Sequence, residues 1–277
     1  MVDTPSILVI DSGVGGLSVC QSILAIGGPL QVIYFADDAF APYGLLDEVV
    51  LEARLEKIVS SMLAIHQPHL VVLACNTVST LLLPQLRTQF DVPFVGVVPA
   101  IKPAAKHSIT NRIGLLATPA TVKRAYTDDL IDDYAGNCDV IRVGSNELVL
   151  QAEALLAGKN VSLEVIESIL KPFLSDDVMP DVDTIVLGCT HFPLLKIYLN
   201  TILPRVSWVD SGEAIAKRVH NLLNGKSLIE HGSVPSDSRS VTHQVYFSKS
   251  LPNSDVFKAA LVKLGFLRSE LHLLNVQ

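Results

Sequence analysis

Short apolar runs alternate with longer amphipathic stretches along the whole chain. The runs are rich in Val, Ile and Leu, and in stretches such as residues 46–65 the apolar positions form one broad stripe of helical period. This alternation is typical of βα units around a largely parallel sheet, so it predicts an α/β fold. We expect strands at residues 7–10, 32–35, 70–73, 94–97, 113–116, 140–143, 185–187, 208–209 and 244–247.

Two strand-and-turn segments occur twice in the sequence. Residues 70–77 read LVVLACNT and residues 184–191 read TIVLGCTH, so each apolar run ends in a small residue, a cysteine and two polar residues. Residues 7–13 (ILVIDSG) parallel residues 113–119 (IGLLATP) in the same way. A duplicated half predicts two domains, each a mostly parallel sheet flanked by helices, with the two cysteines at equivalent positions.

Composition and charge narrow the choice of partner. The chain has 277 residues, of which 49% are hydrophobic, which is enough for one large domain or two ordinary ones. A net charge of −7 without a Lys/Arg cluster argues against nucleic acid or an anionic membrane and favours a small ligand. The apolar run at residues 7–10 is too short for a signal peptide or a membrane span. Four scattered cysteines in such a chain indicate reduced thiols and a cytoplasmic protein.

Cys75 and Cys189 are the candidate reactive residues. Ligands of open α/β sheets bind at the carboxyl ends of the strands, so two facing halves would place one cysteine on each side of a shared interdomain cleft. Inversion of a carbon that bears a weakly acidic hydrogen requires removal of a proton from one face and return of a proton to the other. A thiol can do this where a helix N-terminus lowers its pKa from about 8.5. Both cysteines precede predicted helices, whereas we interpret Cys20 and Cys138 as structural.

Polar residues beside the two cysteines complete the candidate site. His191 lies two residues after Cys189 and could exchange a proton with it. Asp11 ends a strand that we expect beside the strand of Cys75. N–H groups at strand-to-helix turns suit an amino-acid carboxylate, and the side chains there suit its ammonium group. The turns concerned carry Ser12, Asn76, Thr77 and Thr190.

Other functions fit parts of this pattern. A zinc site needs three or four ligands, and Cys189 with His191 offers two, so we expect no metal. The glycines at positions 13, 15 and 16 lack the G-x-G-x-x-G spacing of a nucleotide-binding loop. A cysteine hydrolase would use Cys189 as nucleophile and His191 as base, but it would leave Cys75 without a purpose. A two-domain amino-acid binding protein is the non-enzymatic alternative.

Four ordered motifs span nearly the whole chain. They are residues 10–17 (IDSGVGGL), Asp37 with residues 42–44 (PYG), residues 74–77 (ACNT) and residues 187–191 (LGCTH). Together they resemble the bacterial glutamate racemases, a branch of the cofactor-independent aspartate/glutamate racemases. The resemblance implies an isomerase with no pyridoxal phosphate, other cofactor or metal, which interconverts L-glutamate and D-glutamate for peptidoglycan synthesis.

The same resemblance implies roles for particular residues. Cys75 and Cys189 would be the two proton donors and acceptors, assisted by Asp11 and His191. Asp37 and Glu153 would have supporting roles. Substrate contacts would come from Asp11, Ser12, Tyr43, Gly44, Asn76, Thr77, Thr118, Thr190 and His191. Aspartate stays open as an alternative substrate, because two opposed cysteines would serve both amino acids.

The resemblance also implies a pseudo-symmetric arrangement of two domains and, as is usual in the family, a homodimer. The first domain would comprise residues 1–97 and 208–277, and the second, inserted domain residues 98–207. After the Pro-Tyr-Gly motif the family often has a basic residue and a serine, where this chain has Leu45, Leu46 and Asp47. We therefore expect a different shape for that loop.

Overall fold

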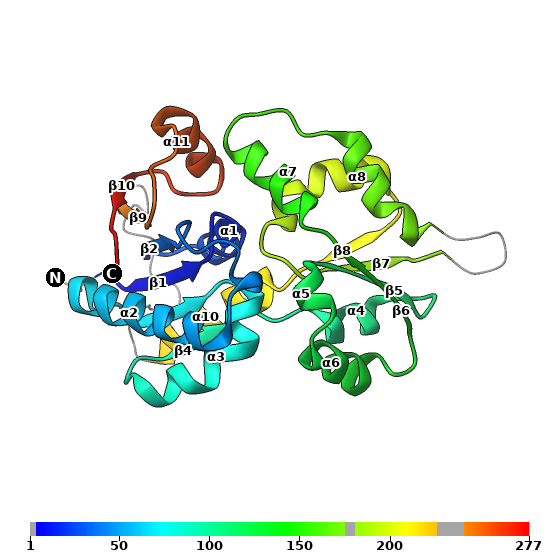
Figure 1. Ribbon diagram of the computed structural model, residues 1–277, viewed down its shortest axis with the longest axis horizontal. Helices are drawn as coiled ribbons and strands as arrows, with labels where there is room; N and C mark the ends of the chain where they lie inside the picture. The colour runs from blue at the N-terminus through cyan, green and yellow to red at the C-terminus, as the bar shows by residue number, and fades with distance from the viewer. Residues whose placement is uncertain (1–3, 175–180, 226–240, 277) are drawn as a thin grey trace. The chain divides into compact units, whose positions relative to one another are not determined.

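The chain folds into two compact units, and the second is inserted into the first (Figure 1). The computed structural model describes residues 4–174, 181–225 and 241–276. The first unit consists of Met1–Val97 and Gly212–Gln277, and the second of Val98–Ser211. Within the described ranges, no helix combines the length and the apolar character needed to cross a membrane.

The first unit is built on a parallel sheet with the strand order β10-β9-β2-β1-β3-β4 in its described part. Every residue of the central strand β1 is buried, so both faces of the sheet are covered. This explains why its sequence is a continuous apolar run rather than an alternating one. The strands are β1 (Ser6–Asp11), β2 (Gln31–Ala36), β3 (Leu70–Leu73), β4 (Phe94–Gly96), β9 (His243–Phe247) and β10 (Ser269–Leu273).

Helices α2 (Glu48–His66) and α3 (Asn76–Gln89) pack on one face of this sheet, where their apolar residues share a core with Leu8 and Ile10 of β1. Elsewhere in the unit, α1 (Leu17–Ala25) and α10 (Gly212–Gly225) pack against each other, and α11 (Ser254–Lys263) lies between β9 and β10 in sequence. A short 3-10 helix, η1 (Tyr43–Leu45), precedes α2.

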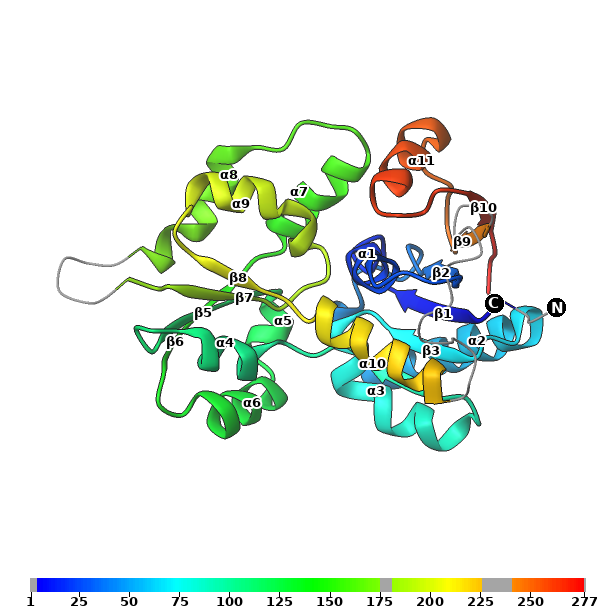
Figure 2. The same cartoon turned by 180° about the vertical axis from the view of Figure 1, so that it is seen from behind.

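The second unit has a parallel sheet with the described strand order β6-β5-β7-β8. Helices α4 and α6 lie on one side of it and α7, α8 and α9 on the other (Figures 1 and 2). The strands are β5 (Arg112–Ala117), β6 (Asp139–Gly144), β7 (Thr184–Leu187) and β8 (Ser207–Val209). The helices are α4 (Ile101–His107), α5 (Pro119–Val122), α6 (Ala125–Ala135), α7 (Glu147–Leu156), α8 (Leu163–Leu170), η2 (Lys171–Phe173), η3 (Phe192–Leu195) and α9 (Lys196–Ile202).

The two sheets share one internal order. Strands β2-β1-β3-β4 of the first unit correspond to β6-β5-β7-β8 of the second. The backbone agrees in detail, since the Ala74 N–H donates to the Ile10 carbonyl at 2.8 Å and the Gly188 N–H donates to the Leu116 carbonyl at 2.8 Å. The prediction of a duplicated α/β half is therefore confirmed, and Cys75 and Cys189 each follow the equivalent strand.

The structure differs from the sequence predictions in two places. The expected return to the first domain at residue 208 is wrong, because β8 pairs with β7 in the second sheet and the second unit extends to Ser211. Strand β10 was not predicted at all. Its residues are half-buried or exposed at the edge of the sheet, so its sequence, Ser-Glu-Leu-His-Leu, lacks the continuous apolar run of the other strands.

Candidate active site

Cys75 lies at the carboxyl end of β3 and is the residue from which α3 begins. It is half-buried, while Asn76 and Thr77 of the first helical turn are each 6% exposed. The first N–H groups of a helix have no partner inside it, and they carry the positive end of the helix dipole. The buried Oδ1 of Asn76 accepts no hydrogen bond within the described part of the chain. This turn therefore offers donors for a carboxylate and an acceptor for an ammonium group.

Asp11 and Ser12 form the neighbouring turn of the first unit. Asp11 ends β1, which pairs with β3, and its carboxylate is buried with Oδ2 accepting from the Gly16 N–H at 2.7 Å. A Cβ at Gly16 would lie only 2.8 Å from the Cβ of Ala74, the residue before Cys75. The glycine thus allows the turns after β1 and β3 to lie in direct contact.

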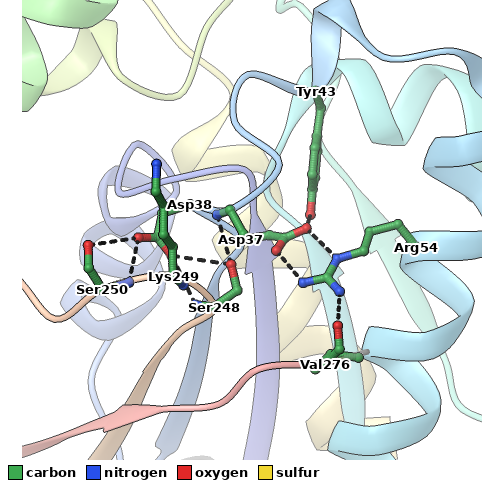
Figure 3. A network of polar contacts seen from close by, with 9 residues as sticks. Asp37, Asp38, Tyr43, Arg54, Ser248, Lys249, Ser250 and Val276 are labelled. Atoms are coloured by element: carbon green, nitrogen blue, oxygen red, sulfur yellow. Dashed lines mark hydrogen bonds and ion pairs between the residues drawn. The ribbon is translucent and has the colours of Figure 1, made fainter.

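The hydroxyl of Tyr43 is hydrogen-bonded to the buried carboxylate of Asp37 (Figure 3). This hydroxyl donates to Oδ2 of Asp37 at 2.9 Å, and Asp37 in turn forms an ion pair with Arg54 at 2.6 Å. Burial, followed by the Asp37 charge, raises the pKa of Tyr43 well above its usual value. The phenol is thus a fixed, neutral group that is already hydrogen-bonded. Gly44, which follows it in η1, is half-buried.

The altered sequence after Gly44 has a local structural role. The Asp47 side chain accepts from the Val49 N–H at 2.9 Å and caps the N-terminus of α2. Leu45 is largely exposed. In this chain, Asp47 therefore supplies a helix cap shortly after the Pro-Tyr-Gly segment.

Cys189 follows β7 in the second unit and lies in a chain of polar contacts. Its Sγ is 3.8 Å from Nδ1 of His191, and Nε2 of His191 is 2.8 Å from Oε1 of Glu153 on α7. Cys189 is 9% and His191 5% exposed, whereas Glu153 is half-buried. A carboxylate at one imidazole nitrogen fixes the orientation of the ring, and the other ring nitrogen lies beside the sulfur.

Two other predicted residues of the second unit lie at turns. Thr190 is buried between Cys189 and His191. Thr118 ends the turn after β5 and caps α5, with its Oγ1 3.0 Å from Oγ1 of Thr121.

Our expectation of a helix directly after Cys189 is wrong in detail, because the 3-10 helix η3 comes first and α9 only begins at Lys196. Pro193 has no N–H to donate to the Cys189 carbonyl, so it disfavours an α-helix that would begin directly after Cys189.

Comparison with known proteins identifies the family of this chain. Residues 7–219 match the model of the Asp/Glu/Hydantoin racemase family. The chain belongs to that family. Curated glutamate racemases of Sodalis glossinidius and Vibrio parahaemolyticus are 43% and 44% identical to this racemase, over 95% and 94% of its chain and 89% and 92% of their own. It is therefore an isomerase, as the sequence motifs predicted.

Solved structures agree with this family. The crystal structure of Escherichia coli glutamate racemase in complex with L-glutamate and the activator UDP-MurNAc-Ala matches this racemase with a TM-score of 0.86 and 42% identity, over 99% of both chains. The crystal structure of a glutamate racemase isoform from Bacillus anthracis matches this chain with a TM-score of 0.78 and 25% identity, over 98% of both chains. The predicted α/β fold with mostly parallel sheets is thereby confirmed.

The remaining cysteines of this racemase lie outside the strand-end turns. Cys20 is fully buried in α1, and burial, followed by the charge of Asp11, raises the pKa of its thiol well above the usual value. Cys138 precedes β6, and burial followed by Asp183 raises the pKa of its thiol as well. Both thiols are thus kept in the neutral form, which suits the structural role that we predicted.

Arg54 is the residue of this network that sequence reasoning missed. It lies within the apolar stripe of α2, where a single arginine gives no sign of its buried partners. Its position one helical turn from Leu51 and Ile58, both fully buried, is the only signal that the guanidinium points inward.

Proposed function

We propose that this racemase interconverts L-glutamate and D-glutamate with Cys75 and Cys189 as its two acid/base groups. The single observation that carries the proposal is the equivalence of the two cysteine turns, each at the carboxyl end of the strand that pairs with β1 or β5. A reaction that needs one proton-transfer group on each face of a carbon matches a duplicated half that supplies one thiol twice.

In the proposed reaction, one cysteine acts as a thiolate and removes the α-proton of glutamate. The electron pair of the broken C–H bond stays on the substrate, and the thiol of the other cysteine donates its proton to the opposite face. The product is the other enantiomer, and the two cysteines have exchanged protonation states. No electron leaves the substrate, so the balance of the reaction needs no redox partner.

Binding of an amino acid follows from the groups at the Cys75 turn. The free N–H groups at the start of α3 suit a carboxylate, and the buried Oδ1 of Asn76 suits the ammonium group. Glutamate as the substrate is supported by the curated relatives named glutamate racemase and by the L-glutamate complex of the Escherichia coli protein. Ser12, Gly44, Thr77, Thr118 and Thr190 would complete the substrate contacts.

His191 and Glu153 would serve Cys189. The carboxylate at 2.8 Å holds the imidazole, and the imidazole at 3.8 Å can return a proton to the thiolate or take one from the thiol. Asp11, beside β3, would serve Cys75 in the same way. We further propose that the protein acts in the cytoplasm as a homodimer and supplies D-glutamate for peptidoglycan.

Solvent isotope incorporation tests the proposal. Purified protein is incubated with L-glutamate in D₂O without added cofactor, and α-deuterium is followed by NMR while D-glutamate is followed by optical rotation. We expect D-glutamate that carries deuterium at the α-carbon, because the donating thiol exchanges with solvent.

The same assay separates the alternatives. Exchange with aspartate but not with glutamate would assign the other substrate. Binding of glutamate without exchange would favour an amino-acid binding protein, and hydrolysis that survives in Cys75→Ala would favour a cysteine hydrolase. Exchange with neither amino acid would contradict the proposed reaction.

A further inference from the structure

Arg54 joins three segments of the first unit that are far apart in sequence (Figure 3). Its Nε and Nη2 donate to the two carboxylate oxygens of Asp37 at 2.9 and 2.6 Å. Its Nη1 donates to the backbone carbonyl of Val276, close to the C-terminus, and its guanidinium carbon lies 4.3 Å from the centre of the Phe40 ring. The residue is 5% exposed, and each of its three nitrogens donates to a partner, which compensates for burying the charge.

Asp37 transmits this arrangement to Tyr43. One carboxylate oxygen, Oδ2, accepts from both Arg54 and the Tyr43 hydroxyl, each at 2.9 Å. Asp37 is fully buried and Tyr43 is 1% exposed, so water cannot replace either bond. A bidentate arginine–carboxylate pair has a fixed geometry, and it therefore fixes the position of the phenol.

Tyr43 lies close to the cysteine turn of the same unit. The helix η1, which begins at Tyr43, contacts α3, which begins directly after Cys75. After burial and Asp37, the charges of Cys75 and Asp11 also raise the pKa of Tyr43, so the phenol lies within electrostatic reach of both. A displacement of Tyr43 would thus displace Gly44 relative to this turn.

Asp38 makes a second, independent connection to the C-terminal part of the chain. Its Oδ1 accepts from the N–H groups of Ser248 and Lys249 at 2.9 and 2.8 Å, and its Oδ2 accepts from the Ser250 N–H at 3.1 Å. Asp38 directly, and Asp37 through Arg54, therefore attach the segment that leads to Tyr43 to residues that come more than 200 positions later.

We propose that Arg54 is a positioning residue of the racemisation reaction. Through Asp37 it holds Tyr43, and with it the backbone of Gly44, against the Cys75 turn, while the Val276 carbonyl holds the guanidinium. Arg54 itself does not contact substrate. The inference rests on the proposed function, because its measured effect is on glutamate turnover.

The variant Arg54→Lys tests this inference. A lysine keeps the charge but cannot bridge both Asp37 oxygens and the Val276 carbonyl, so the Tyr43 segment loses its fixed position. We expect KM for glutamate to rise about tenfold, the scale of one lost charge-assisted hydrogen bond, while kcat changes by less than about threefold. A merely structural role would reduce the amount of folded enzyme and leave KM unchanged, and this outcome would overturn the proposal.

Arg112→Lys is the matched control, because Arg112 forms an ion pair with Asp139 at 3.1 Å in the second unit. The KM of this variant for glutamate should equal that of the wild type. Tyr43→Phe removes only the hydroxyl that Asp37 holds. If Arg54 acts through Tyr43, the rise in KM of the double variant is smaller than the product of the two single effects. Fully multiplicative effects would contradict the proposal.

Two further outcomes are informative. If Arg54→Lys does not fold, Asp37→Asn keeps the shape of the carboxylate and is expected to raise KM in the same way; an unchanged KM there would overturn the inference. A wild-type protein without turnover of glutamate would reject the proposed function and this inference together, whereas an active wild type with an unchanged KM in the variants rejects the inference alone.

Discussion

Cys75 and Cys189 occupy equivalent turns but have different neighbours. The residue equivalent to His191 is Thr77, and the residue equivalent to Asp11 is Ala117. An imidazole thus lies in the Cys189 turn, and a carboxylate lies on the strand beside the Cys75 turn. The duplicated backbone places the thiols at equivalent positions, whereas single substitutions give each thiol different polar neighbours, which in the proposed reaction would support it as an acid or base.

Glu153→Gln tests the support of Cys189. The amide keeps a contact with Nε2 of His191 but removes the carboxylate charge beside the ring, and with it the support that we propose for proton transfer between His191 and Cys189. We expect kcat to fall about tenfold, with a shifted pH profile, and KM to change little. Steady-state kinetics of both enantiomers across pH measure this effect.

Glu147→Gln, at the start of the same helix α7, is the control for the Glu153 variant. It should leave the pH profile unchanged. A Glu153→Gln enzyme with wild-type kcat and pH dependence would show that the ion pair does not serve the reaction.

The start of β7 is secured by Asp183, the residue directly before that strand. Its carboxylate accepts from the Ser108 hydroxyl at 2.7 Å and from the N–H groups of Ile109 and Thr110 at 2.6 and 2.9 Å. Burial acts to raise the pKa of Asp183, but these hydrogen bonds outweigh it and lower the pKa to about 2. The strand that ends at the Cys189 turn is thereby tied to the segment after α4.

Asp183→Asn should therefore destabilise the protein in a pH-dependent way. Because the folded-state pKa is lowered, the stabilisation is fully present above the unfolded pKa of about 4 and is lost as pH falls toward about 2. Asp183 is partly exposed, so we expect a modest fall of roughly 2–4 °C in melting temperature at pH 7.

Calorimetry of the wild type and of Asp183→Asn between pH 7 and pH 2 measures this difference, which should shrink below pH 4. Asp139→Asn, which removes a more exposed carboxylate at the start of β6, is the control and should change the melting temperature less. A difference that stays constant down to pH 2 would contradict the assignment to the Asp183 charge.

At the scale of the whole molecule, the sequence predicts the central strands and both cysteine turns. This is possible because parallel strands that are buried on both faces have continuous apolar sequences. All nine expected strands are found, and the duplicated motif identifies Cys75 and Cys189 as equivalent. The sequence alone does not predict contacts that form only in the tertiary structure. The bonds of Arg54 to Asp37 and Val276, and the edge strand β10, arise only when segments distant in sequence come together.

The central claim is that two equivalent thiols act on one substrate carbon, and the single variants Cys75→Ala and Cys189→Ala test it most directly. Each variant is assayed for racemisation of L-glutamate and of D-glutamate in D₂O, with Cys20→Ala as the control for loss of a buried thiol. We predict that either catalytic variant abolishes racemisation in both directions while Cys20→Ala, if folded, retains it. Sustained racemisation by the Cys75→Ala or the Cys189→Ala protein would contradict the account.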